Sequence, residues 1–142
     1  MASRRTFLKA GLSTSAVGLL ARPIFAGIAE PHYYKAIFDE RFEVARAFAA
    51  GAAERGIPTA AIRGDITRLF FDDLDLRWRQ GPVWLAGYTL PASLFCLDLL
   101  ARDRGMRVVH RAQPDGNPSA PVFWIIAPSR RDRDNRRTEA VS

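Results

Sequence analysis

The sequence predicts an α/β protein, a three-layer sandwich with the element order βαβαβαββ. Short β-rich segments alternate along the chain with amphipathic segments of helical length, which is typical of strands joined by crossover helices. Connections of this length favour parallel neighbours, so we expect a mostly parallel sheet. The length of 142 residues and a hydrophobic content of 48% suit one domain with one core.

The first strand is predicted at residues 33–38 (YYKAIF), which are rich in β-forming side chains. Asp39 can cap the helix that follows. From Phe42 onward, apolar side chains recur at the i, i+3, i+7 spacing of a helix that packs on a sheet. Gly56 provides a left-handed terminus, and Pro58 prevents the helix from continuing.

A second strand and a second helix are predicted next. The strand covers residues 57–63, and Asp65 can cap a helix that ends before Gly81 and Pro82. The third strand, residues 83–87 (VWLAG), is apolar throughout. An uninterrupted apolar run predicts a strand that is buried on both faces, so we expect it in the middle of the sheet.

The last helix begins with Pro91 in its first turn and ends at Gly105. Two strands follow, at Met106–Ala112 and at residues 122–127. The sequence between them, residues 114–118 (PDGNP), is rich in turn-forming residues. We therefore predict a C-terminal antiparallel hairpin.

The N-terminus carries the most specific motif of the chain. Residues 3–9 (SRRTFLK) resemble the twin-arginine (Tat) signal-peptide motif, with Arg4 and Arg5 as the paired arginines. The weakly apolar stretch at residues 10–21 is too short for a stable span of a bilayer about 30 Å thick. Small residues precede Glu30, so we expect cleavage before it. The resemblance implies recognition by the Tat translocase and export in the folded state, to the periplasm or beyond, often together with a partner that carries a cofactor.

The charge pattern divides the chain into three parts. Of the net charge of +6, residues 1–29 contribute +4 and residues 130–142 contribute +2, while residues 30–129 are balanced. We therefore predict a signal peptide at 1–29, a single α/β domain at 30–129 and a disordered charged tail at 130–142. A balanced body gives no reason to expect nucleic-acid binding.

Few side chains are suited to holding a cofactor or metal ion. The single cysteine excludes Cys-ligated iron–sulfur and zinc sites, and no Cys-x-x-Cys-His motif for haem attachment occurs. The two histidines, His32 and His110, show no metal-binding spacing. We therefore expect neither a cofactor nor a metal site.

A ligand-binding crevice is predicted where strand order would reverse. In open α/β sheets, ligands bind beyond the carboxyl ends of the strands at such a point. If the first strand lies beside the third, polar residues from both ends meet there, at a helix start that attracts anions. The alternative is that no ligand binds there, because an ordinary turn and helix cap would contain the same kinds of residues. The candidates are Asp39, Arg41, Gly87, Tyr88, Thr89 and Ser93.

A second candidate site suggests a protein partner. Arg77, Trp78 and Arg79 are consecutive, and arginine and tryptophan are enriched in interface hot spots. A half-exposed Trp78 would bind a partner, whereas a buried one would cover the edge of the sheet. Cys96 is expected to be buried and unreactive, because it lies beyond the first turn of its helix.

Three functions remain open at the level of sequence. The favoured one is an exported accessory or binding subunit, whose partner is a periplasmic oxidoreductase that carries the cofactor. The second is a small-ligand-binding or sensing module that uses the crevice. The third is a small hydrolase or transferase that uses Asp39, Thr89 or Cys96. It is the least favoured, because no set of nucleophile, base and orienting residue is visible.

Overall fold

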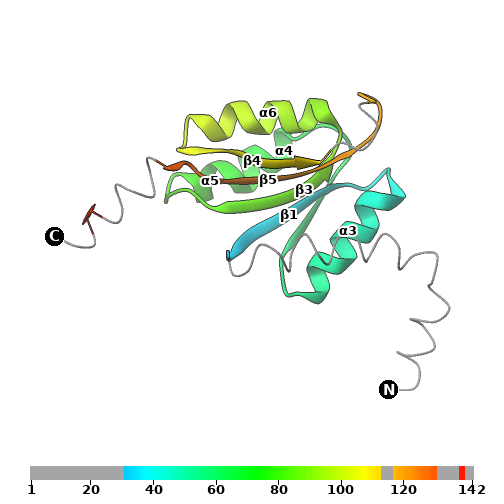
Figure 1. Cartoon of the computed structure of the whole chain (residues 1–142), viewed down its shortest axis with the longest axis horizontal. Coiled ribbons are helices and arrows are strands. Elements are labelled where there is room, and N and C mark those ends of the chain that lie inside the picture. The colour runs from blue at the N-terminus through cyan, green and yellow to red at the C-terminus, as the bar shows by residue number, and fades with distance from the viewer. Residues whose placement is uncertain (1–30, 113–116, 131–137, 140–142) are drawn as a thin grey trace, which may run out of the picture.

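The computed structural model describes residues 31–112, 117–130 and 138–139. The predicted signal peptide, with Arg4 and Arg5, and most of the predicted tail lie outside these residues. A mixed five-stranded sheet in the order β2-β1-β3-β5-β4 forms the centre of the molecule (Figure 1). The strands are β1 (Tyr33–Asp39), β2 (Thr59–Ile62), β3 (Trp84–Thr89), β4 (Met106–Ala112) and β5 (Val122–Pro128). The predicted α/β class is therefore confirmed.

Helical segments follow each of the first three strands. They are α3 (Glu43–Glu54), a continuous run of α4 (Thr67–Leu69), the π-helical η1 (Phe70–Leu74) and α5 (Asp75–Trp78), and α6 (Pro91–Arg102). Pro91 occupies the first turn of α6, as predicted. Asp39 does not cap α3, because Phe42 holds the N-cap position without a side-chain hydrogen bond.

The strand directions correct the expectation of a mostly parallel sheet. β1 is parallel to β2 and β3, whereas β5 is antiparallel to both β3 and β4. Half of the neighbouring pairs are therefore antiparallel. The short connection between β4 and β5 reverses the chain direction, and β5, all seven residues of which are buried, lies between β3 and β4 and is therefore antiparallel to both. The predicted antiparallel hairpin of β4 and β5 is confirmed.

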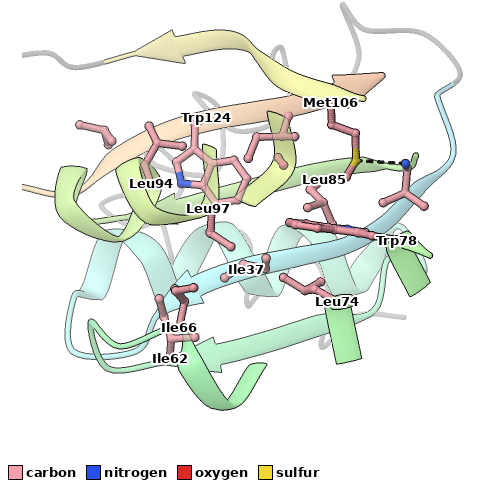
Figure 2. Close-up of a cluster of buried hydrophobic side chains, with 14 residues drawn as sticks. Ile37, Ile62, Ile66, Leu74, Trp78, Leu85, Leu94, Leu97, Met106 and Trp124 are labelled. Carbon is pink, nitrogen blue, oxygen red and sulfur yellow. Dashed lines mark hydrogen bonds between the residues drawn. The ribbon is translucent and has the colours of Figure 1, made fainter. Parts of the chain in front are cut away.

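The helices pack on opposite sides of the sheet (Figure 1). α3 covers β1, β2 and β3 with a stripe of small and aromatic residues that includes Phe48 and Ala52. On the other side, the α4–η1–α5 run and α6 enclose the larger apolar cluster. Figure 2 shows this cluster, with Trp124 beside Leu94 and Leu97 and with Trp78 near Leu74.

A β-bulge in β4 changes which residues face which side. The register with β5 shifts between Val108 and His110. Before the bulge, Met106 and Val108 pack with the cluster beneath α6. After it, His110 contacts Phe123, which lies on the side of α3. An extra residue in one strand shifts by one position the alternation of side chains between the two faces of the sheet. The bulge therefore places the side chain of His110 on the side opposite to Met106 and Val108.

Candidate functional site

The sheet contains the reversal point that the sequence argument required. β1 lies beside β3, and the helices that follow these two strands, α3 and α6, pack on opposite sides. The chain therefore leaves the two strands in opposite directions at their carboxyl ends. In open α/β sheets, this is the place where ligands bind.

Asp39 and Arg41 form a bidentate ion pair at the carboxyl end of β1. Arg41 Nε donates to Asp39 Oδ1 at 2.9 Å, and Arg41 Nη2 donates to Asp39 Oδ2 at 2.6 Å. The backbone N–H of Arg41 also donates to Oδ1, at 3.2 Å. Burial raises the pKa of Asp39, but the hydrogen bonds and positive charge of Arg41 outweigh it and hold the pKa below its ordinary value. Asp39 is therefore an ionised, fully paired carboxylate.

The pair is linked to neighbouring elements through Gly64. The Arg41 guanidinium lies against this glycine, since a Cβ there would come within 2.8 Å of Nη2. Gly64 has a φ of +87°, a conformation that glycine adopts without strain. Its carbonyl accepts a hydrogen bond from Ser93 Oγ at 2.6 Å. Asp39, Arg41 and Ser93 thus connect the end of β1, the loop after β2 and the start of α6.

Gly87 and Thr89 serve the core instead of a ligand. A Cβ on Gly87 would lie 2.0 Å from Cζ2 of Trp124, so the glycine makes room for the indole ring. The indole Nε1 donates to Thr89 Oγ1 at 3.0 Å, and this hydroxyl donates to the Leu90 carbonyl at 3.2 Å. Both residues are buried. The Thr89 hydroxyl is fully engaged and is not positioned as a nucleophile.

Tyr88 lies on the other side of the sheet. Its ring packs near those of Phe48 and Phe123, with centroid distances of 5.9 and 6.2 Å. Burial raises the pKa of its hydroxyl above the ordinary value. The structure therefore brings together Asp39, Arg41 and Ser93 but separates Tyr88 from them. Within this group, the Arg41 side chain is 38% exposed, whereas Asp39 and Ser93 are buried.

The candidate partner site at Trp78 needs correction. Trp78 is only 2% exposed and packs beside Phe70 at a centroid distance of 5.9 Å. It is the last residue of α5 and belongs to the larger apolar cluster, which supports the alternative that a buried Trp78 covers the sheet. Arg79 is exposed and pairs with Asp75 at 2.8 Å, and Arg77 lies over the ring of Tyr34. The three residues do not present a tryptophan to a partner.

A polar cluster that the sequence did not indicate lies at the opposite end of β1. Tyr34 and Lys35 both donate hydrogen bonds to the carboxylate of Asp73, one to each oxygen. Burial, reinforced by this hydrogen bond and by the negative charge of Asp73, raises the pKa of Tyr34 to about 12. Two backbone irregularities lie beside the cluster: a register shift in β1 between Tyr33 and Lys35, and the π-helix that contains Asp73.

Large apolar side chains are exposed on the outer side of the helices. Their exposed fractions are 64% for Phe71, 58% for Leu76, 63% for Phe95 and 48% for Leu99. We call these four residues the helical face. Cys96 is also exposed on α6, which corrects the expectation that it is buried. The stripe of α6 that faces the sheet consists of Ser93, Leu94, Leu97 and Ala101, and position 96 falls outside it.

An open groove of about 470 Å³ runs between α6 and the edge strand β4. Asp98 lies in it and pairs with Arg102 at 2.7 Å, and it also accepts a long hydrogen bond from the Val108 N–H. These contacts stabilise the exposed edge of the sheet. The lining residues are Asp98, Arg102, Gly105, Met106, Arg107, Val108 and Ser129.

The part of the chain that the structure describes contains no group of three His, Cys, Asp or Glu side chains that could hold a metal ion. Within that part, no helix is both long and apolar enough to cross a membrane. No protein-family model matches the chain, and neither a curated protein nor a solved structure is detectably similar to it.

Proposed function

We propose that this protein is a small exported binding subunit, and that its partner is a protein of the periplasm that carries a redox cofactor. The resemblance of residues 3–9 to a Tat signal supports export, to the periplasm or beyond, of a folded protein. We also propose that the fold is a three-layer α/β sandwich. The two apolar clusters on opposite sides of the sheet support this proposal.

The observation that carries the proposal is the helical face. Two hydrogen bonds connect the neighbourhoods of these helices: Ser93, in the first turn of α6, donates to the carbonyl of Gly64 in the loop before α4, and Arg104, just beyond α6, donates to Asp75 of α5 at 3.1 Å.

Phe95 and Leu99 lie one turn apart on α6, and Phe71 and Leu76 lie on η1 and α5. A cluster of large apolar side chains on a soluble surface is typical of a protein-binding site. Covering the exposed parts of Phe71, Leu76, Phe95 and Leu99 would contribute roughly 4 kcal/mol to binding. This is enough to make the helical face the energetic centre of an interface.

The crevice supports the two other functions less well. Asp39 is paired with Arg41, Thr89 is bonded to Trp124, and Gly87 is occupied by the indole ring. These groups are saturated by contacts within the fold. A small-molecule site or a hydrolase would need polar groups that are still available to a substrate.

The test is the state of the protein in a periplasmic extract of its own cells. We expect the tagged chain to migrate in a stoichiometric complex, and the double variant Phe95→Asp/Leu99→Asp to migrate alone. Val109→Asp, an exposed apolar position on β4, is the matched control and should leave the complex intact. A wild-type chain that migrates as a monomer, or a complex that both variants leave intact, would overturn the proposal.

A further inference from the structure

The strand β4 forms one edge of the sheet, next to α6 (Figure 1). β5 pairs with one side of β4, and no other strand of the described residues pairs with its second side. The opposite edge strand, β2, has four residues, whereas β4 has seven. An edge strand presents backbone N–H and C=O groups with which a further extended segment can pair. β4 is therefore the longer of the two places where the sheet can be extended.

The hydrogen bonds of β4 show which backbone groups point away from β5. The Ser129 N–H donates to the Gly105 carbonyl at 2.8 Å, so the backbone of Gly105 faces β5. In an antiparallel pair this direction alternates from one residue to the next, so the polar backbone groups of Met106 and Val108 point outward. The bond from the Val108 N–H to Asp98 Oδ1 on α6 agrees with this direction.

Asp98 holds the Val108 N–H only weakly. The bond is 3.4 Å long, whereas an ordinary N–H···O bond measures about 2.9 Å. The other oxygen of Asp98 pairs with Arg102 at 2.7 Å, so the carboxylate keeps a partner when another acceptor takes the N–H. The open groove of about 470 Å³ lies directly beside this bond. A peptide carbonyl in the groove can therefore replace Asp98 at Val108.

The exposed side chains of β4 determine the charge of a matching segment. Arg107, His110 and Arg111 are exposed, and the strand contains no acidic residue. Arg102 adds a positive charge at the border of the groove, and Asp98 is the only acidic residue among the described residues that line it. Opposite charges on neighbouring strands stabilise their pairing. The edge therefore favours an acidic segment.

The same charges disfavour a second copy of this chain as the added strand. In antiparallel pairing centred on Val109, Arg107 of each copy would lie opposite Arg111 of the other. Like charges directly opposite each other destabilise a strand pair. The two arginines therefore oppose self-pairing while they favour an acidic strand.

We propose that the edge of β4 is a second binding surface, which takes an extended acidic segment of another protein as an added strand. A carbonyl of the segment accepts the Val108 N–H in place of Asp98, and its acidic side chains lie beside Arg107 and Arg111. This surface goes beyond the proposed function, because it is separate from the helical face. The complex held by the helical face does not require it, so a change at Val109 leaves that complex intact.

The test measures the binding of labelled peptides to the full chain by fluorescence anisotropy. The probe is a short capped peptide of alternating glutamate and valine, and the comparison peptide has lysine in place of glutamate. We expect the acidic peptide to bind and the basic one to bind at least about fivefold more weakly. No binding of the acidic peptide, or equal binding of both, would overturn the proposal.

A charge reversal locates the site. Arg107→Glu should weaken binding of the acidic peptide about fivefold, because it places like charges opposite each other. Arg68→Glu makes the same change at an exposed position on α4 and should leave the affinity unchanged. Equal effects of the two variants would show that only the net charge of the protein matters, which would contradict an added strand at β4.

Hydrogen exchange of the Val108 amide, followed by nuclear magnetic resonance, tests the backbone pairing. Saturating acidic peptide should slow this exchange several-fold, while the amides of β2 at the opposite edge stay unchanged. Unchanged exchange at Val108 would place the peptide elsewhere and refute the added strand. A wild-type chain that dimerises and protects Val108 without peptide would assign the edge to a second copy, and peptide binding only after deletion of residues 131–142 would assign it to the chain's own end. Either result would also refute the proposal. All measurements are made without the redox partner, so their failure is distinguishable from the absence of that complex.

Discussion

The indole ring of Trp124 lies so close to the backbone of Gly87 that a Cβ at position 87 would be 2.0 Å from its Cζ2 atom. The two residues are direct neighbours across β3 and β5. Trp124 is fully buried and lies in the centre of the larger cluster, beside Leu94 and Leu97 (Figure 2). The glycine is therefore a packing requirement at a position that the sequence placed in the candidate ligand crevice.

Gly87→Ala should be strongly destabilising, because neither the buried indole nor the central strand can move away. We expect a loss of about 3 kcal/mol in the free energy of unfolding, measured by urea denaturation. Gly51→Ala is the control: a Cβ at position 51 meets nothing within 4 Å, and alanine favours the helix, so we expect an unchanged or slightly raised stability. Equal stability of the two variants would contradict the packing argument.

Thr89→Val tests the buried hydrogen bond of Trp124. The valine keeps the volume but removes the acceptor, so the indole N–H is left unpaired in the core. We expect a loss of roughly 1–3 kcal/mol in thermal or urea unfolding. Thr89→Ser keeps the hydroxyl and should lose less, even though it removes a methyl group. A valine variant as stable as wild type would show that the bond at 3.0 Å is not needed.

Asp39→Asn tests the ion pair with Arg41 through its pH dependence. The folded-state pKa of Asp39 is lowered, because the bonds and charge of Arg41 outweigh the effect of burial. The pair therefore contributes stability above the unfolded-state pKa of about 3.9, and the contribution is lost as the pH falls through the folded-state pKa. We expect the variant to melt several degrees below wild type at pH 7, with a difference that narrows below about pH 4. A constant difference across this range would refute the assignment.

Asp73→Asn tests the cluster at the start of β1. The pKa of Tyr34 is raised to about 12, first by burial and then by its bond to Asp73 and the charge of that residue. Its folded-state pKa lies above the unfolded value of about 10, so its contribution to stability is complete below pH 10 and is lost as the pH rises toward 12. We expect the variant to ionise Tyr34 at lower pH in a spectrophotometric titration. Tyr34→Phe, which lacks this ionisation, identifies the residue responsible. An unchanged titration in the asparagine variant would exclude Asp73 as a cause.

Several features could be predicted because they depend on local pattern. Alternation of β-rich and amphipathic segments gave the α/β class, and Pro91 marked the first turn of α6. Turn-forming residues between the last two strands predicted their antiparallel hairpin, which is observed. Each of these features is decided by residues within a few positions of one another.

The candidate site was predictable only in part. The sequence identified the ends of β1 and β3, and the structure places these strands side by side. It did not indicate that Tyr88 would face α3, or that Trp124 would fill the space against Gly87. It left open whether Trp78 would be half-exposed or buried, and it predicted a buried Cys96, which is exposed. These outcomes depend on which strands and helices lie next to one another in the tertiary structure.

The sequence alone therefore determined the alternation of strands and helices along the chain, and it contained the motif that suggests export. Only the tertiary structure decided that β5 enters the sheet between β3 and β4, and that Asp73 meets both Tyr34 and Lys35. Secondary-structure propensities and helix caps depend on residues a few positions apart, so they can be recognised in the amino-acid sequence. Strand order and side-chain partners result from competition among distant apolar surfaces for the same core, and that competition has no local signal.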